Sequence, residues 1–185
     1  MKTIITLCLA VFLMAGIQDI KAQTKEETIQ WLNDYGTDLT FSYLDNQAKF
    51  KGFDMEFLHF EDRGDLKYED GTRNATTIIS EKVSPKDILY QDITTISENS
   101  FEYDGESFIF RIKTKPKTVV YESNIIDHFK SGDRIEKEKI LRSVIIIIFD
   151  SKEQQKDAIR LIKAIMNLAK LSGADPLPKV SENTF

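Results

Sequence analysis

Two segments near the end of the chain have different apolar patterns: the first is a continuous run, and the second has the spacing of a helix. Val144 to Phe149 is an unbroken apolar stretch, mostly β-branched, which has the length and composition of a buried strand. Ser151-x-x-Gln154 then fits a capping box, and Gly173 is suited to the position just after a helix. Between them, apolar residues recur at spacings of three and four, which predicts an amphipathic helix: Ala158, Leu161, Ile162, Ile165, Leu168 and Ala169.

The preceding part of the chain predicts one helix and then short strands. Thr24 to Glu27 fits a second capping box, Gly36 ends that helix, and Ile29, Leu32 and Tyr35 form its apolar face. Asp70-Gly71 and Asp104-Gly105 suit hairpin turns. The predicted strands, about seven, are 53–60, 66–69, 75–83, 93–98, 107–114, 118–122 and 141–149.

The organisation is that of a single domain. Residues 124–140 are highly charged and are interpreted as a loop or a short helix. No linker or repeat divides the chain, so residues 23–173 are expected to form one domain and residues 174–185 a loose C-terminal tail.

The order of these elements resembles a pleckstrin-homology-like (PH-like) domain. The similarity lies in Ser84-Pro85-Lys86-Asp87-Ile88, Ile93 to Ile96, the segments FIFRIKT, TVVYES and SVIIIIFD, and the final helix. The chain also resembles small secreted bacterial proteins of unknown function that begin with a helix of the KEETIQWL type. The resemblance implies an α+β fold: an N-terminal helix, an antiparallel PH-like barrel or roll, and a C-terminal amphipathic helix. It also implies binding of lipids, peptides or partner proteins.

The N-terminus has the pattern of a secretory signal peptide. Lys2 precedes an apolar segment from Ile4 to Ala15, too short to cross a bilayer as a helix, and Ala22 is a plausible residue before the cleavage site. Residues 1–22 are therefore expected to direct the chain to a secreted or periplasmic location, with no transmembrane segment left after their removal. The single cysteine, Cys8, would be removed with them.

Charge and composition limit the chemistry of the chain. The net charge of −5 argues against nucleic-acid binding, which needs a cationic surface. His59 and His128 are isolated histidines; Asp127-His128 resembles half of an acid–base pair, but no serine has the context of a nucleophile. An acidic cluster lacks calcium-loop spacing and is interpreted as a solvated hairpin: Glu61, Asp62, Asp65, Glu69 and Asp70. We therefore expect no catalytic residue, no metal and no cofactor.

One basic segment is the candidate ligand site. Arg111, Lys113, Lys115 and Lys117 occur at every second position, so a strand continuing through them would place the four cations on one face. Such a face could bind phosphate or carboxylate groups. Pro116 indicates instead that the strand stops there or lies at a sheet edge, where the charges would discourage aggregation.

The sequence thus favours an exported, non-enzymatic binding or interaction module whose partner is unknown. The first alternative is an anion or lipid binder that uses the basic strand. The second alternative is a small hydrolase-type enzyme, which would require a histidine and carboxylates to meet in a concave pocket.

Overall fold

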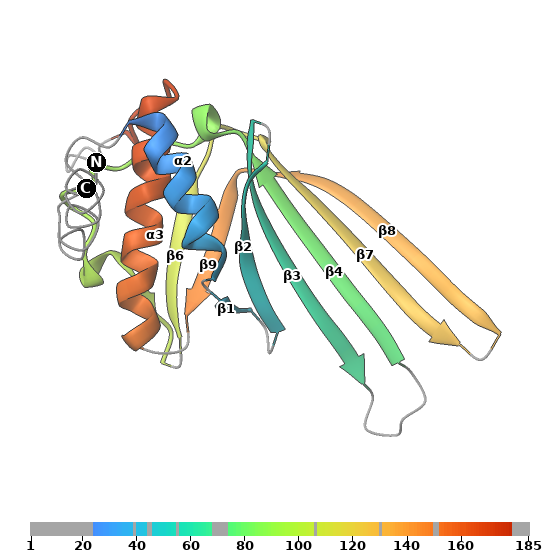
Figure 1. Cartoon of the computed structure of the whole chain (residues 1–185). Helices are drawn as coiled ribbons and strands as arrows, with labels where there is room; N and C mark the ends of the chain where they lie inside the picture. Colours follow the sequence, from blue (N-terminus) through green and yellow to red (C-terminus); the bar gives the residue numbers. More distant parts are fainter. Residues whose placement is uncertain are drawn as a thin grey trace, which may run out of the picture.

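Two helices from opposite ends of the chain pack beside each other at one end of a large antiparallel sheet (Figure 1). The computed structural model describes residues 24–38, 40–43, 46–54, 56–67, 74–105, 107–129, 131–149 and 152–178. The helices are α2 (Lys25–Asp34) and α3 (Lys152–Leu171). The strands are β1 (Thr40–Tyr43), β2 (Asn46–Asp54), β3 (Phe57–Lys67), β4 (Asn74–Val83), β5 (Glu102–Tyr103), β6 (Phe108–Lys113), β7 (Val119–Phe129), β8 (Gly132–Arg142) and β9 (Val144–Phe149).

The strands form two sheets in which every neighbouring pair is antiparallel. The larger sheet has the order β1-β2-β3-β4-β7-β8, and the smaller has the order β5-β6-β9. The strands β8 and β9 are separated only by Ser143, so the chain passes directly from one sheet to the other. The expected α+β class, with a helix before and a helix after antiparallel strands, is confirmed. The described residues contain nine strands, however, where the sequence predicted about seven.

Several predicted strand boundaries were wrong. Residues 124–140, interpreted as a loop or short helix, belong to β7 and β8, two strands of 11 residues each. Residues 53–60 span the end of β2 and the start of β3, and residues 93–98 form no strand. The segment 141–149 is divided at Ser143 between β8 and β9.

The helix-end signals gave better predictions. In the capping box of α2, the Glu27 N–H donates to Thr24 Oγ1 (3.2 Å) and the Thr24 N–H donates to Glu27 Oε2 (2.9 Å). Tyr35, assigned to the apolar face, is 60% exposed instead. The helix α3 is followed by Gly173 with φ of +79°, the left-handed conformation expected after a helix. The proposed cap at Ser151 lies outside the described residues.

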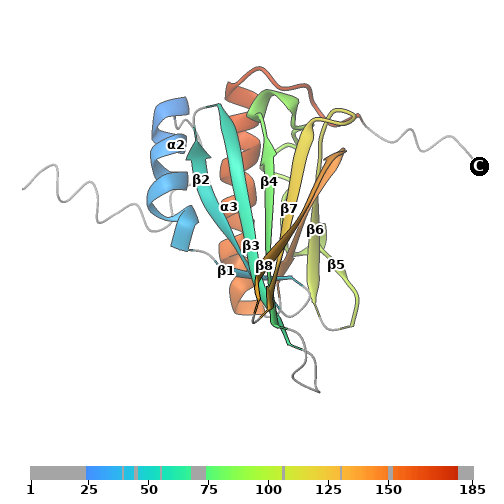
Figure 2. The same ribbon diagram turned by 90° about the vertical axis from the view of Figure 1, so that its right-hand side faces the viewer.

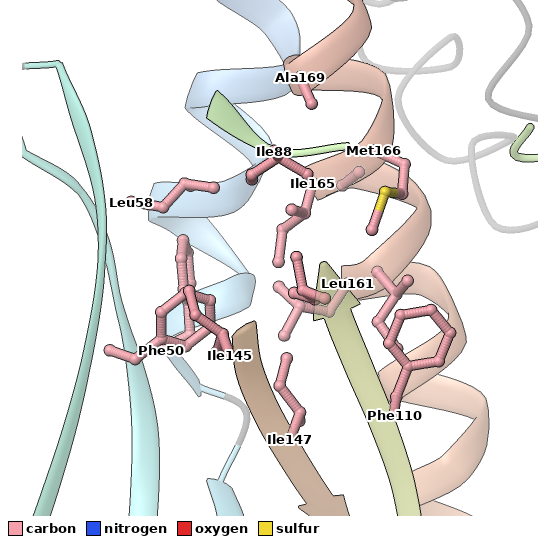
Figure 3. Packing of buried hydrophobic residues seen from close by; sticks show 14 of the residues in the cluster. Phe50, Leu58, Ile88, Phe110, Ile145, Ile147, Leu161, Ile165, Met166 and Ala169 are labelled. Atoms are coloured by element: carbon pink, nitrogen blue, oxygen red, sulfur yellow. The ribbon is translucent and has the colours of Figure 1, made fainter. Parts of the chain in front are cut away.

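The hydrophobic core lies between α3, the inner face of β6 and β9, and the helix-proximal ends of β2, β3, β4 and β7 (Figure 3). Alternation along β9 directs Ile145, Ile147 and Phe149 inward, while the residues between them are only half-buried. From α3 the core receives the predicted apolar stripe, all of it buried: Ala158, Leu161, Ile162, Ile165, Leu168 and Ala169, with Met166 beside them.

Polar contacts join segments that are distant in sequence. Asn167 Nδ2 on α3 donates to Thr28 Oγ1 on α2 (3.1 Å), and both side chains lie at the contact of the two helices. After α3, the chain bonds to the segment around Tyr90: the Tyr90 N–H donates to the Asp175 carbonyl, and the Leu177 N–H donates to the Tyr90 carbonyl. Residues 174–178, expected to begin the loose tail, are therefore held on the domain, and residues 179–185 lie outside the described residues.

Substitution of Gly52 tests the close approach of α2 to β2. Gly52 has φ of +102°, and a Cβ there would lie 2.6 Å from Asn33 Oδ1, the atom that accepts the Phe53 N–H (2.8 Å). Gly105 has φ of +108° with nothing within 4 Å of its added Cβ. Each alanine variant incurs backbone strain of order 1–3 kcal/mol. We expect Gly52→Ala to lower the free energy of unfolding by about 1 kcal/mol more than Gly105→Ala, because Asn33 must release its hydrogen bond. Urea unfolding of both variants measures this difference; equal losses would contradict it.

Candidate functional site: the projecting sheet

The larger sheet extends well beyond the helices. In Figure 1 the strands β3, β4, β7 and β8 run away from α2 and α3 toward the lower right, and neither of these two helices covers their far ends. The helices pack on each other, on β2 and on β9. We call this part of the molecule the projecting sheet and define it by four segments in register: 61–67, 74–80, 122–129 and 132–139.

Both faces of the projecting sheet carry isoleucines. Ile126 stands directly opposite Ile135, and Ile78 lies on the same face because side chains alternate along a strand. Ile79 and Ile125 lie on the opposite face. Ile135 is 55% exposed and the other four are half-buried. A sheet that packs one face on a core normally keeps its apolar residues on that face; this part of the sheet carries partly exposed isoleucines on both.

The strand β8 forms the outer edge of the projecting sheet. Ten of its 11 residues are exposed, and Figure 2, viewed from its side, shows it nearest to the reader. The strand combines alternating charge with exposed apolar side chains at Ile135, Ile140 and Leu141. Its outer edge has no neighbouring strand among those that the structure describes. A long open edge is the part of a sheet on which another strand can pair.

The tip of the projecting sheet holds a short chain of polar contacts. His128 Nδ1 lies 3.0 Å from Asp133 Oδ1 across the β7–β8 hairpin, and His128 Nε2 lies 3.1 Å from Thr76 Oγ1 on β4. The carboxylate partner of His128 is thus Asp133, whereas Asp127, its neighbour in sequence, is buried and lies on the other face.

This hydroxyl–imidazole–carboxylate series lies within the paired strands of the sheet. Thr76 is the third residue of β4 and is paired with Asp65 on one side and Ile126 on the other, so the backbone around it is engaged in the sheet. The contacts are accounted for by cross-strand stabilisation of the tip.

The second histidine makes a similar cross-strand contact closer to the core. His59 Nε2 lies 2.8 Å from Ser80 Oγ on β4. Burial, and then the nearby Lys82 ammonium, lower the pKa of His59 and favour the neutral ring. Glu56, a carboxylate three residues before His59 in the sequence, lies in the turn before β3. Within the described ranges, no group of three or more His, Cys, Asp or Glu side chains could hold a metal ion.

The four predicted ligand residues do not form one strand face. β6 ends at Lys113; Thr114 then bridges to Ile88, and Lys115 and Lys117 lie in the connection to β7. Lys117 has φ of +59°, and its N–H donates to Ser143 Oγ (3.0 Å).

Two of these four cations are also engaged with carboxylates. Arg111 Nε lies 3.1 Å from Glu102 Oε2 on β5, and Lys115 Nζ lies 3.0 Å from Asp175 Oδ2 after α3. Lys113 is exposed at the end of β6. The side chains that the sequence grouped by spacing are therefore distributed over a strand and a turn, and half of their charge is balanced locally.

Part of the acidic cluster lies on a β-hairpin, as its interpretation expected. Glu61, Asp62 and Asp65 lie within β3, which pairs with β4. Glu69 and Asp70 lie outside the described residues. The antiparallel pairing of β3 with β4, ending at Lys67 and Asn74, agrees with a hairpin near Asp70-Gly71.

The sequence interpretation missed most of β8 and the second half of β7 because it took the high charge of residues 124–140 to mean a loop or a short helix. A signal was available: Ile125 and Ile126 favour a strand, and Ser131-Gly132 is a turn pair followed by another strand-length segment. None of the helices in the described ranges combines the length and the apolar character needed to cross a bilayer. Comparison with protein-family models, curated proteins and solved structures finds no match for this chain.

Proposed function

We propose that this protein is an exported, non-enzymatic interaction module and that the projecting sheet is its binding surface. The observation that carries the proposal is the presence of half-buried isoleucines on both faces of a sheet that neither of the described helices, α2 and α3, covers. Apolar surface that is left open on a stable scaffold is typical of a site where another macromolecule binds. The partner chemistry that fits is a protein surface with apolar residues and mixed charge.

The composition of the projecting sheet supports a protein partner over an anionic ligand. Along β8, acidic and basic side chains alternate, so no single sign of charge dominates the edge. The alternative, an anion or lipid site on Arg111, Lys113, Lys115 and Lys117, is weakened because Glu102 and Asp175 pair with two of the four cations. The PH-like resemblance is compatible with a binding role, and it stays part of the proposal, as does export directed by residues 1–22.

Site-specific photo-crosslinking in native cells tests this function. A benzoylphenylalanine replaces Asn124, which is half-buried on the face that carries Ile78 and Ile126, and the matched control places the same group at half-buried Lys163 on α3. We expect irradiation to give a discrete protein adduct in the cell-envelope or secreted fraction from Asn124 only. Equal adducts from both positions, or only uncrosslinked chain from Asn124, would contradict the proposal.

A further inference from the structure

The open edge of β8 has a defined hydrogen-bonding pattern. Phe129 and Gly132 are the last pair of the β7–β8 hairpin and stand directly opposite each other across a two-residue connection, which makes them a hydrogen-bonded pair. Such pairs alternate along an antiparallel ladder. Backbone N–H and C=O groups therefore face away from β7 at every second residue of β8: Asp133, Ile135, Lys137, Lys139 and Leu141.

We propose that β8 pairs antiparallel with β8 of a second copy of this chain, around a two-fold axis at Ile135. An axis perpendicular to the sheet places each residue opposite the one equally far from Ile135 on the other side. Ile135 then meets Ile135 of the second copy. Asp133 meets Lys137, and Arg134 meets Glu136. Each of these ion pairs occurs twice by symmetry.

The charges of β8 select this register over its neighbours. An axis at Lys137 would set Lys137 against itself and Glu136 against Glu138. An axis at Glu136 or Glu138 would set that carboxylate against its own copy, and an axis at Arg134 would do the same with a guanidinium. Like charges directly opposite destabilise a strand pair, while opposite charges and apolar pairs stabilise it. The register at Ile135 brings no like charges together, and it covers the only apolar side chain in the paired segment 132–138.

The same charges discourage pairing with unrelated strands. Charged edge residues commonly protect a sheet from aggregation, because most incoming strands meet unpaired charge. Within one chain, Asp133 Oδ1 lies 3.0 Å from His128 Nδ1, and Arg134 Nη2 lies 3.0 Å from Glu136 Oε1. A second copy in this register adds a group of opposite charge beside each of these exposed side chains. In Figures 1 and 2, β8 is the outermost strand, so a second copy can approach its edge without meeting the helices.

The pairing through β8 rests on the projecting sheet of the proposed function, but the two proposals can fail separately. If the purified chain is a monomer and Asn124 still crosslinks to a different protein, the dimer is wrong and the interaction module stands. If the purified chain dimerises through β8 and Asn124 gives no adduct in cells, the proposed function is wrong and the dimer stands.

Sedimentation velocity of the purified chain, with charge variants, tests the pairing. We expect the wild type to sediment with twice the mass of one chain as concentration rises. Arg134→Glu sets two carboxylates opposite each other at two places and should weaken association at least tenfold. The double variant Arg134→Glu, Glu136→Arg exchanges the charges and should restore it. Lys156→Glu, which makes the same change in net charge at an exposed position on α3, should associate like the wild type.

A crosslink measures the register. In a Cys8→Ser background, a short bismaleimide should join two copies through Ile135→Cys, since this position lies on the axis. Lys139→Cys should not react in this way, because its two copies would stand about 27 Å apart at 3.4 Å per residue. A monomeric wild type, no restoration by the double variant, or crosslinking that is stronger at Lys139→Cys would overturn the proposal.

Discussion

Replacement of Ile162 by aspartate is expected to abolish cooperative folding at room temperature. Ile162 is fully buried on the inner side of α3, within the cluster that also holds Leu161 and Ile165. The variant loses the apolar burial of the isoleucine and places a carboxylate where neither water nor a partner can stabilise it. Changes of this kind cost more than about 4 kcal/mol, a large share of the stability of a typical domain. Near-ultraviolet circular dichroism and urea unfolding measure the loss.

The matched control is Lys156→Asp on the same helix. Lys156 is exposed, so an aspartate there keeps its hydration, and the expected change is within about 0.5 kcal/mol. If the two variants unfold at the same urea concentration, α3 does not pack as the structure places it.

A second large effect is expected at the ion pair of Glu81 and Arg142. Arg142 Nη1 donates to Glu81 Oε1 (3.2 Å), and its guanidinium lies 3.6 Å from the centre of the Tyr121 ring. The Glu81 side chain is only 15% exposed, so it depends on this partner. Arg142→Met keeps the aliphatic stem over Tyr121 but removes the charge. We expect a loss of about 2 kcal/mol at pH 7, as for hydrogen bonds to charged groups.

This loss should depend on pH in a defined direction. Burial raises the pKa of Glu81 above its usual 4.5, and Arg142 opposes the shift only in part. A carboxyl whose pKa is raised by folding contributes stability below its unfolded-state pKa, and that contribution is lost as pH rises through the folded-state pKa. Without Arg142 the pKa rises further, so the stabilities of wild type and Arg142→Met should converge as pH falls from 7 toward 4.5.

Lys139→Ala is the control for this pH dependence. Lys139 Nζ lies 2.7 Å from Glu122 Oε1, but both side chains are exposed on the projecting sheet. The Lys139 hydrogen bond lowers the pKa of Glu122, so this carboxyl keeps its charge throughout the range above pH 5. The difference in stability between Lys139→Ala and wild type should therefore be small and should stay constant from pH 7 to pH 5. A gap for Arg142→Met that stays constant over that range would show that Glu81 is not held as described.

The sequence predicts well those elements whose apolar spacing results from the burial of a single face. The helix α3 is buried along a single stripe, so its spacing identifies its extent, and Phe110 and Ile112 alternate because one face of β6 is in the core. The strand β8 has no such pattern: both of its faces are exposed, so neither selects apolar residues at alternate positions. This segment is a strand because it pairs with β7, and the local composition of β8 does not show that pairing.

The basic segment predicted as a ligand site also shows that local sequence does not determine where a strand ends. The spacing of Arg111, Lys113, Lys115 and Lys117 is a property of sequence, but the point where the strand stops depends on contacts from other parts of the chain. Ile88 bridges to Thr114, and Ser143 accepts the N–H of Lys117, so the strand that carries Arg111 and Lys113 ends before Lys115. The surface that now carries the proposed function arises from what the helices leave uncovered, and that depends on the whole fold.

The contact between α2 and α3 has a kinetic consequence. Thr28 and Asn167 are separated by 139 positions, so the core cannot close until almost the entire chain is available. Pairings between such distant residues form slowly, because a long loop must close before they stabilise anything. During synthesis, the apolar side of α2 therefore stays without its final neighbour until α3 has left the ribosome. The chain can therefore acquire its stable form only after both α2 and α3 are available. The export proposed above would require a chain that is still open in this way.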